Sequence, residues 1–126
     1  MANSEVRRIF NAFVYSLHGL KATWTTEPAF VIEVVTCILL IPLACVLSLP
    51  LISKALLISS LLLLLIVELI NTAIEVIVDR ISLDIHPLSK KAKDIGSAAM
   101  LISLINALII WTLVIWPLIK SKVTTF

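Results

Sequence analysis

The sequence predicts an all-α membrane protein, with one amphipathic surface helix followed by three transmembrane helices. Hydrophobic residues make up 60% of the 126 positions and charged residues only 14%, whereas a soluble domain is nearer half apolar and a quarter charged. The mean hydropathy is +1.13, and three apolar stretches each approach the length of about 20 residues that crosses a bilayer. The length favours a single domain, 1–126. A net charge of +2 is too small to indicate a nucleic-acid partner.

The first element is predicted to be an amphipathic surface helix over residues 5–26. Its apolar residues recur at three- and four-residue spacing, which places them on one stripe of a helix. A second row is polar and includes Arg8, Tyr15 and His18. Such a helix suits the headgroup layer, with its apolar side at the acyl boundary. The apolar stripe is Val6, Phe10, Phe13, Val14, Leu17, Leu20 and Trp24.

The rest of the chain is predicted to cross the membrane three times. The first span covers 29–50, and a short turn at 51–54 leads into the second span, 55–79. A polar loop over 80–93 then precedes the third span, 97–119. The small residues that open this third span would allow close helix packing.

The distribution of basic residues predicts the topology. Two spans separate the N-terminal segment from the 80–94 loop, so both lie on the same side. That side holds more Lys and Arg than the other, and the positive-inside rule places it in the cytoplasm. We therefore expect a multi-pass inner-membrane protein with a cytoplasmic N-terminus. The basic residues on that side are Arg7, Arg8, Lys21, Arg80, Lys90, Lys91 and Lys93.

Near its far end, the second span carries a stripe of polar residues. At 100° per residue, Glu68, Asn71, Glu75 and Asp79 fall within roughly 80° of one another on the helix. A carboxylate at membrane depth is costly and by default indicates a functional site. Three carboxylates in line call for a cation, a proton relay or a polar ligand.

The residue types favour phosphoryl transfer at a membrane interface, although other classes remain open. Carboxylate oxygens suit Mg²⁺ together with substrate phosphates, and Lys and Arg suit the phosphates themselves. Glu68 lies deeper and suits a general base for a hydroxyl. The chain has only two glycines, Gly19 and Gly96, so it contains no glycine-rich nucleotide loop. A small cation-coupled transporter and a membrane scaffold are the alternatives.

The run from Glu68 to Asp79 fits the pattern E-x-x-N-[ST]-A-I-E-x-x-x-D and is followed by Ala92-Lys93-Asp94. With these motifs the chain closely resembles the prokaryotic diacylglycerol kinase family over nearly its whole length. The resemblance implies a homotrimer of three transmembrane helices plus a surface helix, with active sites shared between subunits. It also implies phosphorylation of 1,2-diacylglycerol in membrane lipid to phosphatidate, with ATP as phosphoryl donor and Mg²⁺ as cofactor.

The resemblance assigns roles residue by residue. Glu68 matches the catalytic base, and Glu27 and Glu75 match the metal-binding carboxylates. Asn71 and Asp79 match supporting positions. The positions matched to ATP binding are Arg8, Tyr15, Glu27, Glu75, Asp84, Ile85, His86, Lys93 and Asp94. Those matched to the lipid substrate are Arg8, Ser16, Lys21, Trp24, Glu33, Glu68 and Ser97.

One branch of the family phosphorylates undecaprenol instead, and this substrate is the alternative within the class. Val31, Ile32 and Lys21 depart from the common family pattern on the lipid side. Arg80 and the segment from Gly96 to Ala99 favour the diacylglycerol branch.

Overall fold

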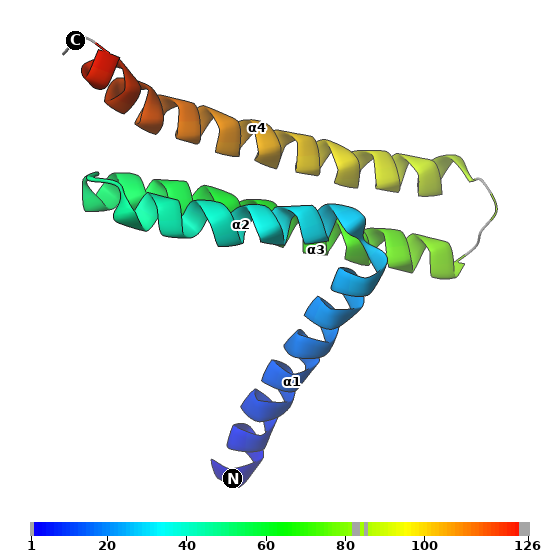
Figure 1. Ribbon diagram of the computed structural model, residues 1–126. Coiled ribbons are helices and arrows are strands. Elements are labelled where there is room, and N and C mark those ends of the chain that lie inside the picture. Colours follow the sequence, from blue (N-terminus) through cyan, green and yellow to red (C-terminus); the bar gives the residue numbers. More distant parts are fainter. Residues whose placement is uncertain (1, 82–83, 85, 124–126) are drawn as a thin grey trace.

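The computed structural model describes residues 2–81, 84 and 86–123, and within that part of the chain the regular structure is entirely helical. Helix α1 spans Ala2–Thr26, α2 spans Pro28–Val46, α3 spans Leu51–Ile81 and α4 spans Pro87–Val123. Helices α2, α3 and α4 run alongside one another, and α1 projects away from the start of α2 (Figure 1). Among the described residues, three helices are long and apolar enough to cross a membrane, namely α2, α3 and the Pro87–Lys120 part of α4. The prediction of an all-α protein with three membrane-length helices is confirmed.

The helices of the bundle are joined by short connections. The sequence prediction of a turn at 51–54 was wrong, because α2 already ends at Val46 and α3 starts at Leu51. Pro50 lies directly before α3, and its carbonyl accepts a hydrogen bond from the Lys54 amide at 3.2 Å. The Lys54 ammonium group donates to the Cys45 carbonyl at 2.6 Å, so its side chain satisfies one of the last carbonyls of α2.

The predicted polar loop over 80–93 is also largely helical. Helix α3 continues to Ile81, and α4 begins at Pro87 rather than near residue 97. Proline is favoured in the first turn of a helix because its missing N–H is not needed there. The Leu88 amide donates to the His86 ring nitrogen Nδ1 at 3.2 Å, so His86 caps α4. The acidic and basic residues at this end of the bundle are therefore held on helices.

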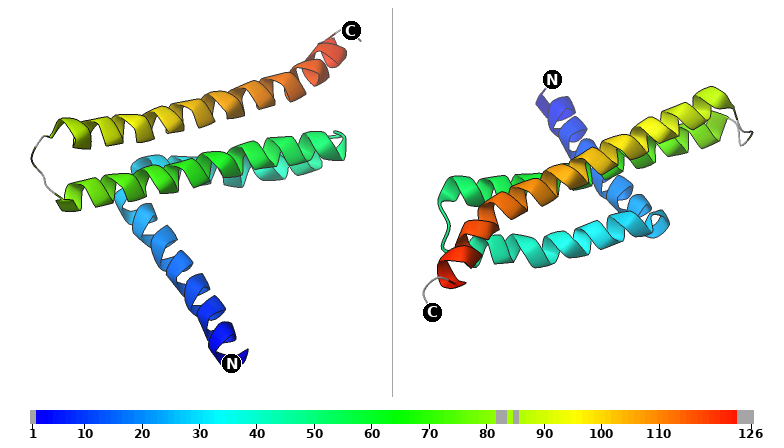
Figure 2. Two further views of the ribbon diagram at one scale, coloured as in Figure 1. Left: turned by 180° about the vertical axis from the view of Figure 1, so that it is seen from behind. Right: turned by 90° about the horizontal axis from the view of Figure 1, so that it is seen from above.

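The bundle has a narrow core and a wide apolar surface. Its buried apolar side chains include Cys37 and Ala44 of α2, Leu57 and Leu61 of α3, and Ala107 of α4. Helices α3 and α4 have the most extensive contact, and α1 contacts α2 near their junction. The two views of Figure 2 show α4 crossing over α3 while α2 lies alongside α3. Many large apolar side chains of α2, α3 and α4 remain exposed, as expected for helices that face lipid or other subunits.

Candidate active site

The most buried carboxylate of the site is that of Glu68 on α3, which is only 5% exposed. Glu33 of α2 is half-buried and lies within electrostatic range of Glu68 on the neighbouring helix. Its Oε2 atom is buried and has no hydrogen-bond partner among the described residues. Glu27 and Glu75 also lie within electrostatic range of Glu68. Carboxylates from two neighbouring helices therefore gather around Glu68.

An amide orients one of these carboxylates. Asn71 and Glu75 are one helical turn apart on α3, and Asn71 Nδ2 donates to Glu75 Oε1 at 3.0 Å. Both side chains are partly buried. The hydrogen bond fixes one oxygen of Glu75 and leaves the other for a ligand. This arrangement agrees with the supporting role predicted for Asn71.

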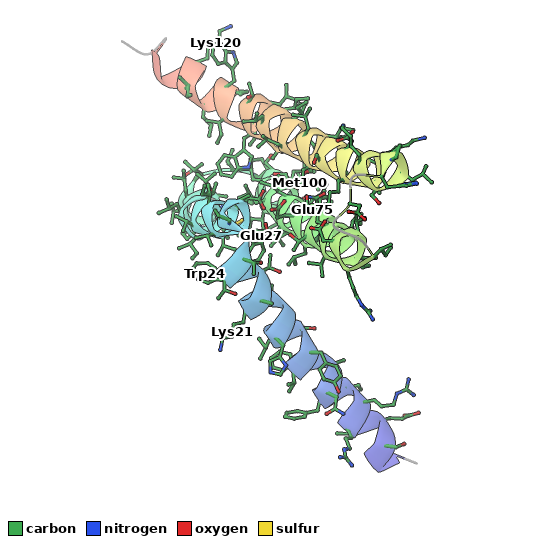
Figure 3. All side chains as sticks on the ribbon, turned by 90° about the vertical axis from the view of Figure 1, so that its right-hand side faces the viewer. Lys21, Trp24, Glu27, Glu75, Met100 and Lys120 are labelled. Carbon is green, nitrogen blue, oxygen red and sulfur yellow. The ribbon has the colours of Figure 1, made fainter. Side chains whose placement is uncertain are left out.

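Glu27 lies at the N-cap of α2, where α1 ends. Its side chain makes no capping hydrogen bond to the α2 backbone, and the residues that usually cap a helix in this way have shorter side chains, such as Asp or Ser. Figure 3 looks along the bundle from the end that carries the α3–α4 connection, and it shows Glu27 at the α1–α2 junction and Glu75 where α3 faces α4. The Glu27 carboxylate is half-buried at this junction and makes no hydrogen bond to the backbone of α2.

The carboxylates suit a metal ion that is shared with phosphate groups. Within the described residues, no group of three or more His, Cys, Asp or Glu side chains could hold a metal by itself. Mg²⁺ commonly binds to one or two protein carboxylates and completes its shell with substrate phosphates and water. The carboxylate of Glu27, which makes no hydrogen bond to the α2 backbone, and the carboxylate of Glu75, which Asn71 orients, fit that pattern of donors.

Ion pairs occupy the polar end of the bundle. Lys93 Nζ of α4 lies 2.6 Å from Asp79 Oδ1 of α3 and links the two helices. Lys90 Nζ lies 2.6 Å from Asp94 Oδ2 one turn away on α4. Both pairs are substantially exposed, so they contribute little to stability and can exchange partners. A phosphate group could therefore compete for either lysine.

The predicted residues of the α3–α4 connection lie next to these ion pairs in the chain. Asp84 and His86 are exposed, and His86 uses Nδ1 to cap α4. Ile85, which was also predicted to contact nucleotide, lies outside the described residues. Ser97 is exposed on α4, immediately after the buried Gly96.

The predicted residues of α1 are exposed and lie apart from the carboxylates. Arg8 and Tyr15 line one shallow hollow on the surface of α1, and the first half of this helix extends away from the bundle (Figure 1). The Ser16 hydroxyl donates to the Ala12 carbonyl at 2.9 Å. Lys21 and Trp24 lie on the half of α1 nearer the bundle (Figure 3). A single chain therefore brings together Glu27, Glu33, Glu68 and Glu75 but not Arg8 or Tyr15.

The sequence did not reveal the role of three buried positions. Gly96 contacts the Asn71 side chain, and Thr23 and Thr72 are at least nine-tenths buried. The sequence analysis gave Gly96 no contact of its own and grouped it with the small residues that permit close packing and with the segment that favours the diacylglycerol branch. The burial of the two threonines could not be predicted from the sequence, because it depends on which helix faces contact each other.

The fold and the site together define an integral membrane protein of the helical-bundle type. It has an acidic site that begins inside a membrane-length helix and continues to a surface rich in Lys and Arg. Comparison with known proteins then shows the family.

A model of the prokaryotic diacylglycerol kinase family matches residues 14–115. The chain is 48% identical over 118 residues to the diacylglycerol kinase of Escherichia coli strain K12, covering 92% of this chain and 97% of that relative. It is 46% identical over 110 residues to the diacylglycerol kinase of Pseudomonas aeruginosa strain PAO1, covering 87% and 89%. It is 45% identical over 105 residues to that of Helicobacter pylori strain 26695, covering 83% and 82%. The chain belongs to the prokaryotic diacylglycerol kinase family.

Proposed function

We propose that this chain transfers the γ-phosphoryl group of ATP to the free hydroxyl of 1,2-diacylglycerol and produces phosphatidate. Membership of the diacylglycerol kinase family gives the reaction class. The observation that carries the proposal is the nearly buried Glu68 on a membrane-length helix, with Glu27 and Glu75 close by. A lipid alcohol can reach this depth while a nucleotide remains at the polar end.

Glu68 is proposed as the general base. Its carboxylate accepts the proton of the diacylglycerol hydroxyl as the hydroxyl oxygen forms a bond to the γ-phosphorus of ATP. The bond from that phosphorus to the oxygen bridging to the β-phosphate breaks, and ADP leaves. Most of the catalysis in such transfers comes from positioning and from neutralising charge.

Glu27 and Glu75 are the residues proposed to hold Mg²⁺. When bound, Mg²⁺ neutralises charge on the phosphate oxygens and helps to orient them. Asn71 orients Glu75 through the 3.0 Å hydrogen bond. Asp79 forms an ion pair with Lys93 and so holds the lysine at the polar end of the bundle, where the nucleotide is proposed to bind. The remaining residues proposed to contact nucleotide are Arg8, Tyr15, Asp84, Ile85, His86, Lys93 and Asp94.

The lipid side of the site is proposed to include Glu33 and Ser97 from the bundle. Ser16, Lys21 and Trp24 would contribute from α1, together with Arg8. We place the chain, as a single domain, in the bacterial inner membrane with its N-terminus in the cytoplasm and α1 in the headgroup layer. The exposed apolar side chains of α1, which include Phe10, Phe13 and Trp24, support that position because the bundle does not cover them.

The working unit is proposed to be a homotrimer with sites shared between subunits. Within one chain, the first half of α1 lies apart from the carboxylates of α2 and α3 (Figure 1). A site that includes both Arg8 and Glu68 therefore requires α1 of another subunit or a large movement of α1. Assembly would also cover part of the exposed apolar surface of the bundle.

The test offers two lipid alcohols side by side in mixed micelles with labelled ATP and Mg²⁺. We expect labelled phosphatidate from diacylglycerol, little product from undecaprenol, and no product after chelation of the metal. Labelled undecaprenyl phosphate as the main product would move the substrate to the other branch of the family. Transfer to neither lipid by a well-folded preparation would overturn the proposed function.

A further inference from the structure

We propose that Gly96 is a positioning residue, which sets the orientation of Glu75 by confining the side-chain amide of Asn71. The inference rests on the proposed function, in which Glu75 binds Mg²⁺. It deepens that function by extending the metal site across the α3–α4 interface to a residue without a side chain.

The first step is the contact between the two helices. Gly96 is buried on α4, and a Cβ atom built on it would overlap Asn71 Oδ1 and would lie 3.3 Å from Asn71 Cγ. The same atom would lie 3.9 Å from Asn71 Cα, which is an ordinary van der Waals contact. The space is therefore closed by the amide of Asn71 and not by the backbone of α3.

The second step concerns how the amide is held. In glycine a hydrogen occupies the direction of the missing Cβ, so only the small Cα–H group of Gly96 faces Asn71 Oδ1 and the amide can lie against the α4 backbone. Oδ1 is buried and has no hydrogen-bond partner among the described residues. The other end of the amide, Nδ2, donates to Glu75 Oε1 at 3.0 Å. Gly96 and Glu75 thus hold opposite ends of one amide group.

The third step is the consequence of adding a methyl group. In Gly96→Ala, the new Cβ would force the Asn71 amide to rotate, and the hydrogen bond to Glu75 would be lost. Glycine is otherwise unfavourable inside a helix, so a local reason for its presence is expected. At Gly19, the other glycine of the chain, the corresponding Cβ position has no atom of the described residues within 4 Å, apart from the neighbouring residues and backbone of its own helix.

The functional effect should appear in the metal requirement. Hydrogen bonds from outer residues orient metal ligands and raise their affinity. We expect Gly96→Ala to raise the Mg²⁺ concentration for half-maximal transfer by about three- to tenfold, the range expected from the loss of one hydrogen bond. The KM for diacylglycerol should stay unchanged, because the lipid side of the site is not altered.

A double-mutant cycle tests whether Gly96 acts through Asn71. Asn71→Ala alone should weaken the metal response, and adding Gly96→Ala to it should have no further effect, because the colliding atoms are gone. Gly19→Ala is the matched control for the same chemical change in open space and should leave the Mg²⁺ titration unchanged. An undiminished effect of Gly96→Ala in the Asn71→Ala background would overturn the inference.

A spectroscopic measurement tests the geometry without relying on turnover. In the full chain labelled with ¹⁵N-asparagine, the side-chain signal that disappears in Asn71→Ala belongs to Asn71. That signal should shift in Gly96→Ala and stay in place in Gly19→Ala, and an unmoved signal would contradict the inference even if the wild-type chain transferred no phosphate. If Gly96→Ala fails to assemble, the double variant must recover assembly. Failure of both would show that the methyl group meets backbone and would also contradict the inference.

Discussion

At the scale of single residues, burial and hydrogen bonding give the four glutamates of the site different environments. Glu68 is almost fully buried, Glu75 accepts a hydrogen bond from Asn71, and Glu27 lies at the N-cap of α2 without a capping hydrogen bond from its carboxylate. Glu33 keeps one buried oxygen that has no hydrogen-bond partner within the described part of the chain. A membrane protein retains such costly groups when they serve a function, and the proposed roles of base, metal ligand and lipid contact give each of these carboxylates one.

The metal role of Glu75 predicts a specific kinetic change. Glu75→Gln keeps the shape of the side chain but removes its charge. We expect the Mg²⁺ concentration for half-maximal transfer to rise by about 10–100-fold or more, because losing a ligand should cost at least as much as losing an outer partner of one. The measurement is a Mg²⁺ titration at saturating ATP, with the KM for diacylglycerol as the internal control. A titration that overlays that of the wild-type chain would exclude Glu75 as a ligand.

The sequence leads to a prediction of the site residues but not of the interactions between them. The stripe from Glu68 to Asp79 follows from helical periodicity alone, because those residues share one helix. The contact between Gly96 and Asn71 depends on two helices that meet at a particular depth, which no spacing within one helix determines. The ring nitrogen of His86 caps α4, and this capping depends on where the helix starts.

At the scale of the helices, the sequence predicted their number and order but placed several ends wrongly. Polar residues at 80–93 suggested a loop, yet Lys90, Lys93 and Asp94 lie on α4. Lys90 and Asp94 are four residues apart and can pair because this segment is helical. Helices α3 and α4 therefore extend beyond their apolar parts, and these extensions carry the predicted contacts to nucleotide.

The position of α1 leads to a prediction about Trp24, which is 46% exposed in the single chain. In a variant with Trp111→Phe and Trp116→Phe, Trp24 is the sole tryptophan. Since amphipathic helices and tryptophan side chains favour the interface, lipids brominated near the headgroup should quench its fluorescence more strongly than lipids brominated near the chain ends. Emission typical of water, without quenching by either lipid, would show that α1 does not lie on the membrane.

At the scale of the whole molecule, one chain does not assemble every predicted contact. Its carboxylates come from α2, α3 and the α1–α2 junction (Figure 3), while Arg8 and Tyr15 lie on a helix whose first half extends away from the bundle (Figure 1). The homotrimer was predicted only from the family resemblance, because no spacing along the chain specifies contacts between subunits. Because Arg8 and Tyr15 lie apart from the carboxylates within one chain, a site that includes all of them would need a second subunit or a movement of α1.

Shared sites predict complementation between two inactive variants. Glu68→Gln should remove the base, and Arg8→Ala should weaken nucleotide binding severely. Unfolding and reassembling an equal mixture should restore up to about one quarter of the wild-type sites, because random mixing then pairs an intact Glu68 with an intact Arg8 from a neighbouring subunit. Each variant reassembled alone is the control. A mixture no more active than either control would indicate that each site is built within a single chain.

The most direct test of the whole account compares the wild-type chain with Glu68→Gln in one assay of Mg²⁺-dependent phosphatidate formation, with the assembly state measured on the same samples. The variant is isosteric, so assembly should be unchanged. Turnover should fall by about 10²–10⁴-fold, the contribution expected of a general base. A variant that retains more than a tenth of the wild-type rate, or that loses activity only because it no longer assembles, would contradict the assignment of Glu68 as the catalytic base.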